Sequence, residues 1–324
     1  MRVLVTGASG FLGRAVATAV RDAGHEVRTF QRRPSGLVPR DGLEDRLGSV
    51  TSPSDVQAAV SGMDAVVHLA AKVSLAGDPR EFDRVNVLGT RLLLDAARSA
   101  GVTRTVFVSS PSVAHAGASI VGDDALPASP STARGDYART KAVAELAALG
   151  MDTDDFRVVA VRPHLVWGPG DTQLVARIVD RARRRRLPLL GDGAALIDTT
   201  YVDNAASAMV AALDRVDDVH GNAYVVTNGE PRPVAELLAG ICGAARVPAP
   251  SVRVPAGLAR FAGSVLERVW AVRPGEDEPP MTRFLAEQLS TAHWFDQRRT
   301  RRDLRWSPSV SLDEGFRRLA ESYR

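Results

Sequence analysis

Two side chains that can exchange protons stand four residues apart in the segment YARTK (137–141). Residues at this spacing share one face of a helix, so Tyr137 and Lys141 can point at one ligand. An unperturbed tyrosine titrates near pH ~10, which is too high for free proton exchange at neutral pH. A nearby ammonium lowers that pKa, so the pair predicts proton transfer to a ketone or from an alcohol. The only other lysine of this arginine-rich chain is Lys72.

Three serines end the apolar run before this helix, in the segment VFVSSPSV (106–113). The run is typical of a buried strand, and the carboxyl end of such a strand faces the ligand crevice of an α/β fold. A hydroxyl there could hydrogen-bond a substrate oxygen and stabilise its charge during hydride transfer. We expect this role for Ser110, a border with the cofactor for Ser109, and a second substrate candidate in Ser112. The structural alternative is that each serine caps loop backbone groups.

A glycine-rich loop, TGASGFLG (6–13), joins the first apolar strand to an amphipathic helix. Gly7 allows a tight turn, Gly10 lets the backbone approach a pyrophosphate, and Gly13 allows the helix to pack closely on the strand. A pyrophosphate would lie at the helix N-terminus, where free N–H groups point outward. The pattern therefore predicts a dinucleotide site in this strand–helix context. The loop residues expected to contact the cofactor are Gly7, Ser9, Gly10, Phe11, Leu12 and Gly13.

The end of the second strand bears on the choice of cofactor. An enzyme that uses NAD usually carries an acidic residue there for the ribose hydroxyls. This strand instead ends in Gln31, Arg32 and Arg33. A guanidinium can bind a 2′-phosphate that a carboxylate would repel. We therefore expect NADPH (NADP) to be favoured over NADH (NAD), unless the two arginines are only exposed loop residues.

Strands and helices alternate through the first half of the chain, and the strands are apolar along their whole length. This pattern predicts an α/β fold: a Rossmann-type doubly wound parallel sheet with helices on both faces. The expected strands are 2–6, 26–30, 65–70, 104–109 and 157–162. The expected helices are 11–23, 55–60, 80–100 and 135–149.

Glycine and proline become frequent after residue 163, and only one further strand–helix unit is expected, at 197–213. We expect an NADP-binding Rossmann domain over 1–163 plus 197–219. A smaller, mainly helical substrate-binding domain would comprise 164–196 and 220–324. Four consecutive arginines end the run at 181–186, after a helix that starts near residue 172. They fit a solvated helix C-terminus, with an anionic ligand as the alternative.

The bulk composition narrows the classes of function. A net charge of +3 is too small to indicate a nucleic-acid binder. The single cysteine, Cys242, excludes an internal disulfide and a multi-cysteine metal site, and we expect no metal. No apolar run reaches the roughly 18 residues of a membrane span, and the chain opens directly on a strand without a leader. We expect a cytoplasmic protein.

Together these residues resemble the extended short-chain dehydrogenase/reductase superfamily along essentially the whole chain. TGASGFLG is similar to its nucleotide loop, Tyr137 and Lys141 to its catalytic pair, and Ser110 to its catalytic serine. The segment NVLGT (86–90) resembles the superfamily's helix whose asparagine helps to order the site, and YVDN (201–204) a common element of its second domain. The resemblance implies further cofactor contacts at Ala70, Ala71, Lys72, Asn86, Ser109, Pro163, His164 and Val166.

Within the superfamily the chain looks most like the 3β-hydroxysteroid dehydrogenase-like branch, and closer still like bacterial 2-alkyl-3-oxoalkanoate reductases of olefin biosynthesis. The segments that carry this resemblance are SSPSVAHAG (109–117), VRPHLVWGPGD (161–171), DTTYVDNAA (198–206) and PPMTRFLAEQLSTAHWFD (279–296). It implies reduction of a β-keto acid with two long alkyl chains to a β-hydroxy acid. It also implies a homodimer formed through helices 80–100 and 135–150, and leaves open a place in a larger biosynthetic complex.

Such a substrate would need an apolar tunnel and a cation for its carboxylate. The tunnel is expected in 255–290, where an amphipathic stretch at 255–271 could also be a lid, a core helix or a membrane contact. The candidate substrate contacts are Ser112, His115, His164, Trp167 and Arg283, with Lys72 as a further candidate for the carboxylate. Each has a structural alternative, since buried histidines are more often hydrogen-bonded residues of the core.

One departure and three alternatives remain. Where the superfamily often has Gly-Asp after its third strand, this chain has Gly48-Ser49, which puts the adenine contacts in doubt. A hydroxysteroid or sterol dehydrogenase would share all the chemistry and differ only in the pocket. A nucleotide-sugar epimerase or dehydratase would need a more polar second domain than residues 255–290 indicate. A nonenzymatic NADP sensor would typically lose the Tyr–Lys pair, which is present here.

Overall fold

The computed structural model describes residues 1–37, 42–74, 77–115, 117–255, 257–258, 261 and 290–324. Its main body is a parallel sheet of seven strands in the order β12-β7-β5-β4-β1-β2-β3. The strands are β1 (Arg2–Thr6), β2 (Glu26–Gln31), β3 (Leu43–Leu47), β4 (Ala65–His68), β5 (Arg104–Val108), β7 (Arg157–Pro163) and β12 (Ala223–Val226). The order reverses between β1 and β4, as in a doubly wound sheet, so the predicted fold class is confirmed.

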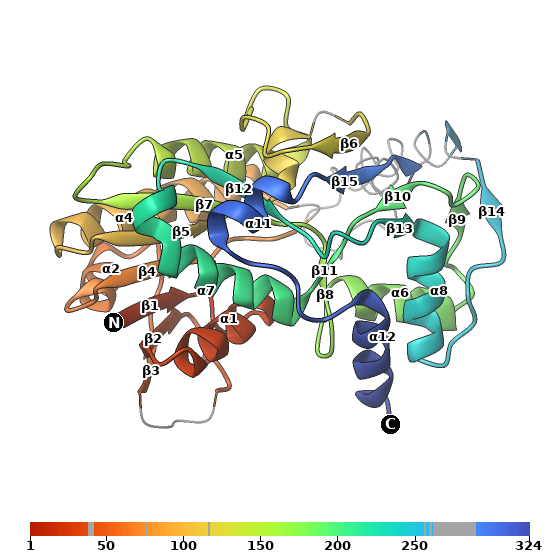
Figure 1. Cartoon of the computed structure of the whole chain (residues 1–324), viewed down its shortest axis with the longest axis horizontal. Helices are drawn as coiled ribbons and strands as arrows, with labels where there is room; N and C mark the ends of the chain where they lie inside the picture. Colours follow the sequence, from red (N-terminus) through yellow and green to blue (C-terminus); the bar gives the residue numbers. More distant parts are fainter. Residues whose placement is uncertain (38–41, 75–76, 116, 256, 259–260, 262–289) are drawn as a thin grey trace.

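Alternation along each strand divides the core into two layers. Val3 and Val5 belong to one buried cluster, whereas Leu4 between them belongs to the cluster on the other face. Side chains that alternate across a sheet produce this division, and burial on both faces explains why the strands are apolar throughout. Helices α1 (Phe11–Asp22) and α7 (Val202–Val219) cover the first face; α2 (Pro53–Val60), α4 (Gly89–Ser99) and α5 (Gly135–Leu149) cover the second (Figure 1).

A second lobe lies beyond the carboxyl edge of the sheet, at the right of Figure 1. Helices α6 (Leu174–Arg183), α8 (Val234–Ala244) and α12 (Leu312–Glu321) share one apolar core, which includes buried Cys242. Short strands link the lobes: β6 (Ile120–Asp123), β10 (Leu196–Ile197), β13 (Arg232–Pro233) and β15 (His293–Phe295) form one sheet. The pairs β8 (Val166–Trp167) with β11 (Thr200–Tyr201), and β9 (Leu189–Leu190) with β14 (Arg253–Val254), form two more. Helix α11 (Arg298–Leu304) packs near α7 and β12.

The structure corrects three expectations about the elements. The strand expected at Ile197 belongs to the small four-stranded sheet, and β12 after α7 is the last strand of the main sheet, beyond the expected boundary at 220. The edge strand β3 follows from no apolar pattern, because its sequence LEDRL is charged and largely exposed; only the resemblance, which places Gly48 after a third strand, implied it. The helix expected over 80–100 is divided into α3 (Pro79–Phe82), a π-helical turn η1 (Asp83–Leu88) and α4.

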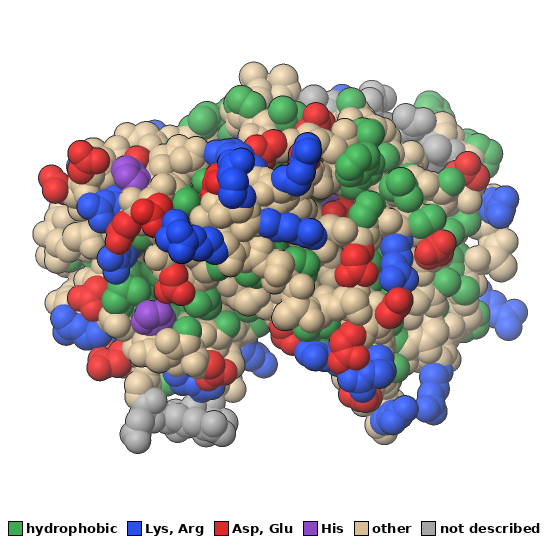
Figure 2. Space-filling model, in the orientation of Figure 1, with side chains coloured by type: hydrophobic (Ala, Val, Ile, Leu, Met, Phe, Trp, Pro, Cys, Tyr) green, Lys and Arg blue, Asp and Glu red, His purple; other side chains and the backbone are tan. Residues whose placement is uncertain are grey.

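Charged side chains of both signs intermix on the face shown in Figure 2. Many arginines have acidic partners, such as Arg104 with Asp217 and Arg299 with Asp124. The arginines that follow α6 are exposed, and Arg184 pairs with Asp180, as expected for a solvated helix end. Among the described residues, no helix has the length and apolar character to cross a membrane.

Candidate active site

The predicted site residues from the first half of the chain meet at the carboxyl edge of the main sheet. Strands β1, β4, β5 and β7 end side by side, since Thr6 lies opposite His68, His68 opposite Phe107, and Val108 opposite Val161. The loops that leave these ends carry the glycines, Ala70 to Lys72, the serines, and Pro163 to His164. The register of the sheet therefore collects residues that lie far apart in the sequence.

The glycine loop has the close contacts that its sequence predicts. The backbone of Gly7 has a φ of +76°, and a Cβ there would approach the backbone of Ala70 to 3.0 Å. A Cβ on Gly13 would lie 2.2 Å from the carbonyl oxygen of Gly7, so helix α1 can approach β1 only without a side chain. No side chain caps the N-terminus of α1 at Gly10. Its free N–H groups fit the pyrophosphate of a dinucleotide, beside the half-buried Ser9, Phe11 and Leu12.

An acidic residue of the neighbouring strand β3 approaches the end of β2, and the sequence pattern did not predict it. Asp45 of β3 accepts hydrogen bonds from Gln31 Nε2, from Thr29 Oγ1 at 2.5 Å and from the backbone of Ser35 at 3.1 Å. Gln31 is buried, and its Oε1 has no hydrogen-bond partner among the described residues. Arg32 and Arg33 are exposed. The pairing of two neighbouring strands supplies the acid, so the spacing after the glycine loop could not reveal it.

Tyr137 and Lys141 both lie on α5 and face the end of β5. The Lys141 ammonium is buried, donates to the carbonyl oxygen of Val108 at 2.7 Å and lies 4.2 Å from the ring centre of Phe107. Burial lowers the pKa of Lys141 to about 8, and the negative charge of Glu145 opposes this shift. Lys141 is therefore anchored by the same strand that presents the serines.

The pKa of Tyr137 moves in the direction opposite to the one expected. Burial raises the pKa of Tyr137 to about 12, and a hydrogen bond with Ser110 opposes the rise only in part. The expected effect of the Lys141 charge is not among the causes of this shift. Tyr137 is therefore protonated at neutral pH, which is the state needed to give a proton to a ketone oxygen.

The three serines are in different environments. Ser110 is half-buried and accepts hydrogen bonds from the hydroxyl of Ser112 at 3.0 Å and from its backbone N–H at 3.3 Å. Ser112 therefore contacts Ser110, and Ser110 forms a hydrogen bond with Tyr137. Ser109 is buried, and its Oγ has no hydrogen-bond partner among the described residues.

Asn86 lies in the π-helical turn η1 and is fully buried. Its amide joins two parts of the site: it holds the backbone of Lys72 through bonds of 2.7 and 3.2 Å and donates to Thr140 Oγ1 at 3.0 Å. The Lys72 ammonium bonds Glu81 and lies over the ring of Phe82. Asn86 is thus placed to order the site, whereas the charge of Lys72 already has a partner.

The residues of the second half of the chain that were predicted to contact the substrate lie in different environments. His164 is buried and bonds the carbonyl oxygen of Asp198 at 2.7 Å. It forms a cluster with His115 and His293, whose ring centres lie 4.6 Å apart. Burial lowers the pKa of His164 to about 4 and that of His293 to about 2, so both are neutral near pH 7. They would offer hydrogen bonds rather than a charge to a carboxylate.

Trp167 does not fit the substrate contact expected for it. The indole is 1% exposed, donates to Thr199 at 2.9 Å and stacks on Phe316 in the core of the second lobe. Val166 lies beside it on β8 and is half-buried. Arg283 lies outside the described residues, as does most of the expected tunnel segment 255–290.

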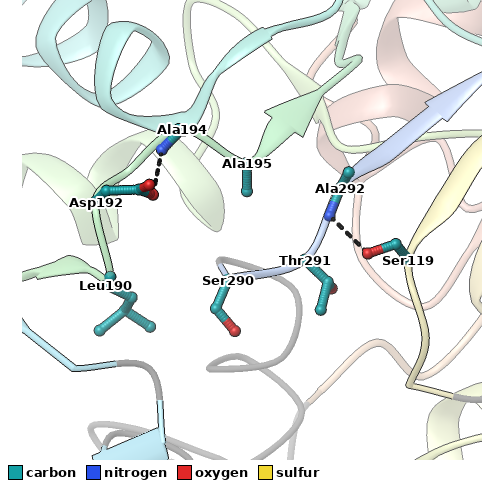
Figure 3. A pocket seen from close by; sticks show the side chains of 9 residues that line it. Ser119, Leu190, Asp192, Ala194, Ala195, Ser290, Thr291 and Ala292 are labelled. Carbon is teal, nitrogen blue, oxygen red and sulfur yellow. Dashed lines mark hydrogen bonds between the residues drawn. The ribbon is translucent and has the colours of Figure 1, made fainter.

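A pocket of about 480 Å³ opens in the second lobe (Figure 3). It is lined by the loop between β9 and β10, by Ser119, and by the segment that enters β15. Leu190, Ala194, Ala195 and Ala292 supply apolar surface, and Ser119 Oγ accepts from the backbone of Ala292 at 3.3 Å. Thr291 of the lining bonds His293 at 3.0 Å, which connects the pocket to the histidine cluster.

Comparison with known proteins gives the family. Residues 3–227 match the NAD dependent epimerase/dehydratase family. The chain is 40% identical to a 2-alkyl-3-oxoalkanoate reductase of Stenotrophomonas maltophilia (strain K279a) over 99% of both chains. It is 32% identical to a 3-beta-hydroxysteroid dehydrogenase of Mycolicibacterium neoaurum, over 97% of this chain and 89% of that protein. The solved structure of MoeE5 in complex with UDP-glucose and NAD is similar with a TM-score of 0.75 and 26% identity, over 99% of this chain and 98% of that one.

The fold, the glycine loop and the residues matched by the family all indicate the same family. The likeness to 3-beta-hydroxysteroid dehydrogenases also agrees with the branch that the sequence resembles. The chain belongs to the NAD dependent epimerase/dehydratase family and is an NAD(P)-dependent oxidoreductase.

Proposed function

We propose that the enzyme reduces the ketone of a 2-alkyl-3-oxoalkanoate to the corresponding 2-alkyl-3-hydroxyalkanoate, with NADPH as the favoured cofactor. The observation that carries the reaction type is the protonated Tyr137, hydrogen-bonded to Ser110 at the carboxyl edge of the sheet. The substrate class rests on relatives that bear this name and are 40% and 36% identical over nearly the whole chain.

Each residue of the site has its own role in the proposed reduction. The cofactor supplies a hydride to the carbonyl carbon when it is bound. Tyr137 donates its phenolic proton to the carbonyl oxygen, so that hydride and proton together yield the alcohol. Ser110 donates a hydrogen bond to the same oxygen and stabilises its developing charge. Lys141 then stabilises the tyrosinate that remains until a proton from solvent replaces the one transferred.

The cofactor preference rests on the exposed Arg32 and Arg33. Two guanidinium groups at the end of β2 suit a 2′-phosphate. Asp45 of β3 is bonded to Gln31 and Thr29 of β2 and to Ser35, and these hydrogen bonds hold its carboxylate against the neighbouring strand. For the substrate, the 480 Å³ pocket offers both leucine and alanine side chains, which suit an alkyl chain, and polar side chains such as Ser119 and Asp192.

The test measures oxidation of NADPH and NADH with a long-chain 2-alkyl-3-keto acid, in the wild type and in Tyr137→Phe. We expect faster turnover with NADPH and a loss of kcat of at least about 100-fold in the variant, since removal of a general acid costs about 10²- to 10⁴-fold. Tyr224→Phe is the matched control, because the Tyr224 hydroxyl bonds Asp303 away from the site. Full activity of Tyr137→Phe would contradict the mechanism.

A hydroxysteroid dehydrogenase is the second candidate, since such an enzyme is 32% identical over 97% of this chain. Turnover of a 3-ketosteroid that depends on Tyr137, without turnover of the keto acid, would retain the mechanism and replace the substrate.

We also propose a homodimer formed through α4 and α5. Leu88, which precedes α4, and Leu146 of α5 are each 47% exposed, and both helices cover the same face of the sheet. Sedimentation as a monomer at micromolar concentration would reject this dimer.

A further inference from the structure

A chain of buried polar groups crosses the site beneath the residues that perform the proposed chemistry. It begins at Thr6, the first residue of the glycine-rich loop, passes through His68 at the end of β4 and Thr90 of α4, and reaches Asn86. All four residues are at most 1% exposed. Asn86 continues the chain to Thr140 of α5, between Tyr137 and Lys141.

The hydrogen bonds determine which nitrogen of His68 carries the proton. Thr90 Oγ1 donates its only hydrogen to the carbonyl oxygen of Asn86 at 2.6 Å, so it must accept from His68 Nε2 at 3.0 Å. His68 Nδ1 is then an acceptor, and the Thr6 hydroxyl donates to it at 2.8 Å. That hydroxyl in turn accepts from the backbone N–H groups of Leu69 and Ala70 at 3.1 and 3.0 Å. Every donor and acceptor in this row of polar groups has a partner only if the His68 imidazole is neutral and protonated at Nε2.

The surroundings of His68 favour this neutral state. The imidazole is buried beside the ring of Phe107, with ring centres 5.8 Å apart. The Lys141 ammonium lies over the same ring and is the charged group that faces His68. A second positive charge at this depth would meet both desolvation and repulsion.

The far end of this row of hydrogen-bonded groups lies in α5, the helix that carries Tyr137 and Lys141. Thr140 Oγ1 accepts from Asn86 and donates to the carbonyl oxygen of Asp136 at 2.7 Å in the first turn of α5. Asn86 also holds the backbone of Lys72 at both its N–H and its carbonyl oxygen. The same few groups therefore hold the end of β1, the loop after β4, and the turn of α5 that carries Tyr137.

We propose that His68 is a positioning residue, whose neutral, Nε2-protonated imidazole couples the glycine loop to η1 and α5 and so sets Tyr137 relative to the bound cofactor. It touches neither reacting atom and acts through Thr90 and Asn86. The effect on turnover rests on the proposed reductase activity, whereas the tautomer of His68 does not.

The test removes the hydrogen bonds that Thr90 makes to His68 and Asn86. Thr90 is not among the residues that perform the proposed chemistry. Thr90→Val retains the shape of the side chain but removes both hydrogen bonds, and Thr90→Ser restores the hydroxyl. The matched control is Thr105→Val on β5, because Thr105 is buried in the same sheet and its Oγ1 has no partner among the described residues. The measurements are kcat and KM for the keto acid, the Kd of NADPH by fluorescence, and the thermal midpoint.

We expect Thr90→Val to lower kcat about tenfold, with KM and Kd changed less than about threefold, as for the loss of one buried hydrogen-bond partner. Thr90→Ser should recover most of kcat, and Thr105→Val should leave it unchanged. Should Thr90→Val fail to fold, Thr140→Val interrupts the same chain from α5 and should give the same loss. Full kcat in Thr90→Val or Thr140→Val, or a Thr90→Ser as slow as Thr90→Val, would overturn the proposal.

A second measurement is independent of turnover. In the ¹⁵N spectrum of histidine-labelled protein, the signals missing from His68→Gln should show a neutral, Nε2-protonated ring, and NADPH should shift them in the wild type more than in Thr90→Val. An Nδ1-protonated or charged ring would overturn the proposal. Absence of turnover of the keto acid by the wild type, together with the expected spectrum, would instead reject the proposed substrate and leave the positioning role standing.

Discussion

At the scale of single residues, burial controls the acid–base properties of the site. Tyr137 and Lys141 have pKa values of about 12 and about 8, and desolvation is the largest cause in both cases. Desolvation favours the neutral form of each group, so it moves the two values in opposite directions. The protein thus holds a protonated phenol beside an ammonium that loses its charge within an accessible range of pH.

The lowered pKa of Lys141 predicts that activity and stability change in opposite directions as the pH rises above 8. The pKa of Lys141 in the folded protein, about 8, lies below its ordinary value of 10.5, so the unfolded chain binds the extra proton between these values. The free energy of unfolding should therefore gain up to about 1.4 kcal/mol per pH unit from this group as the pH rises from 8 to 10.5. Over the same range kcat should fall up to about tenfold per unit, because the charge that stabilises the tyrosinate is lost.

The measurement is a kcat profile from pH 6 to 10 beside urea unfolding at the same pH values. A kcat that stays level to pH 10 would contradict the role of the Lys141 charge, whatever the stability does.

At the scale of elements, the contacts between α1, β1 and the loop after β4 decide whether a cofactor can bind. The positive φ of Gly7 and the close approach at Gly13 leave no room for a side chain. Residues 83–88 are a second case, because the π-helical turn places Asn86 against Lys72 and Thr140. Such turns often occur at functional sites, and here the turn carries the residue that joins two parts of the site.

We predict that Gly13→Ala weakens NADPH binding by at least about tenfold and lowers the free energy of unfolding by about 1–3 kcal/mol, as for overpacking of a core. The added Cβ would lie 2.2 Å from the Gly7 carbonyl oxygen, so the helix must move away from the strand and from the pyrophosphate site. NADPH titration and urea unfolding measure the two effects.

The control is Gly243→Ala in α8, where a Cβ would meet nothing within 4 Å and the backbone is helical. This change should stabilise the protein by about 0.5–1 kcal/mol, as alanine does in an exposed helix. Wild-type NADPH affinity in Gly13→Ala would show that the close approach is not needed for binding.

At the scale of the whole molecule, the two lobes meet through buried polar groups as well as apolar contacts. His164 on the connection after β7 contacts His293 and Phe295 of β15, and Asp198 bonds Thr227 and the backbone of Glu230. Arg162 of β7 and Glu145 of α5 form a buried ion pair within the first lobe. Burial shifts the pKa values of His164, His293 and Asp198, so these three groups make folding sensitive to pH.

The buried histidines predict a loss of stability in mild acid. His68, His164 and His293 have folded pKa values of about 3, 4 and 2, all below the ordinary 6.5. Below pH 6.5 the unfolded chain binds protons that the folded protein does not, so each histidine lowers the free energy of unfolding by up to about 1.4 kcal/mol per pH unit. Asp198 opposes one of them below pH 6, because burial raises its pKa to about 6 and the folded state then binds the extra proton.

Urea unfolding at pH 7, 6, 5.5 and 5 checks this prediction: the free energy of unfolding should decline throughout, and more steeply below pH 6 than between pH 7 and pH 6. The strongly paired carboxylates of Asp296 and Glu314 have pKa values of about 2 and contribute at lower pH. Equal stability at pH 7 and pH 5 would show that these histidines accept protons without unfolding.

The sequence by itself determined strands β1, β2, β4, β5 and β7, the glycine loop, and the position of Tyr137 and Lys141 on one helix. These features depend on local periodicity and on short spacings, which a linear pattern contains. It did not determine β3, whose charged sequence suits an exposed edge, or β12, which pairs with β7 only after the chain has passed through part of the second lobe.

Only the tertiary structure decided the electrostatics of the site and the partners of its polar groups. The raised pKa of Tyr137, the approach of Asp45 to Gln31, and the neutral His68 between Thr6 and Thr90 all depend on burial and on contacts between distant segments. The indole of Trp167 lies in the core for the same reason, since packing of the second lobe encloses it. Spacing along a chain predicts which groups share an element, whereas desolvation and hydrogen bonding depend on every element that packs around them.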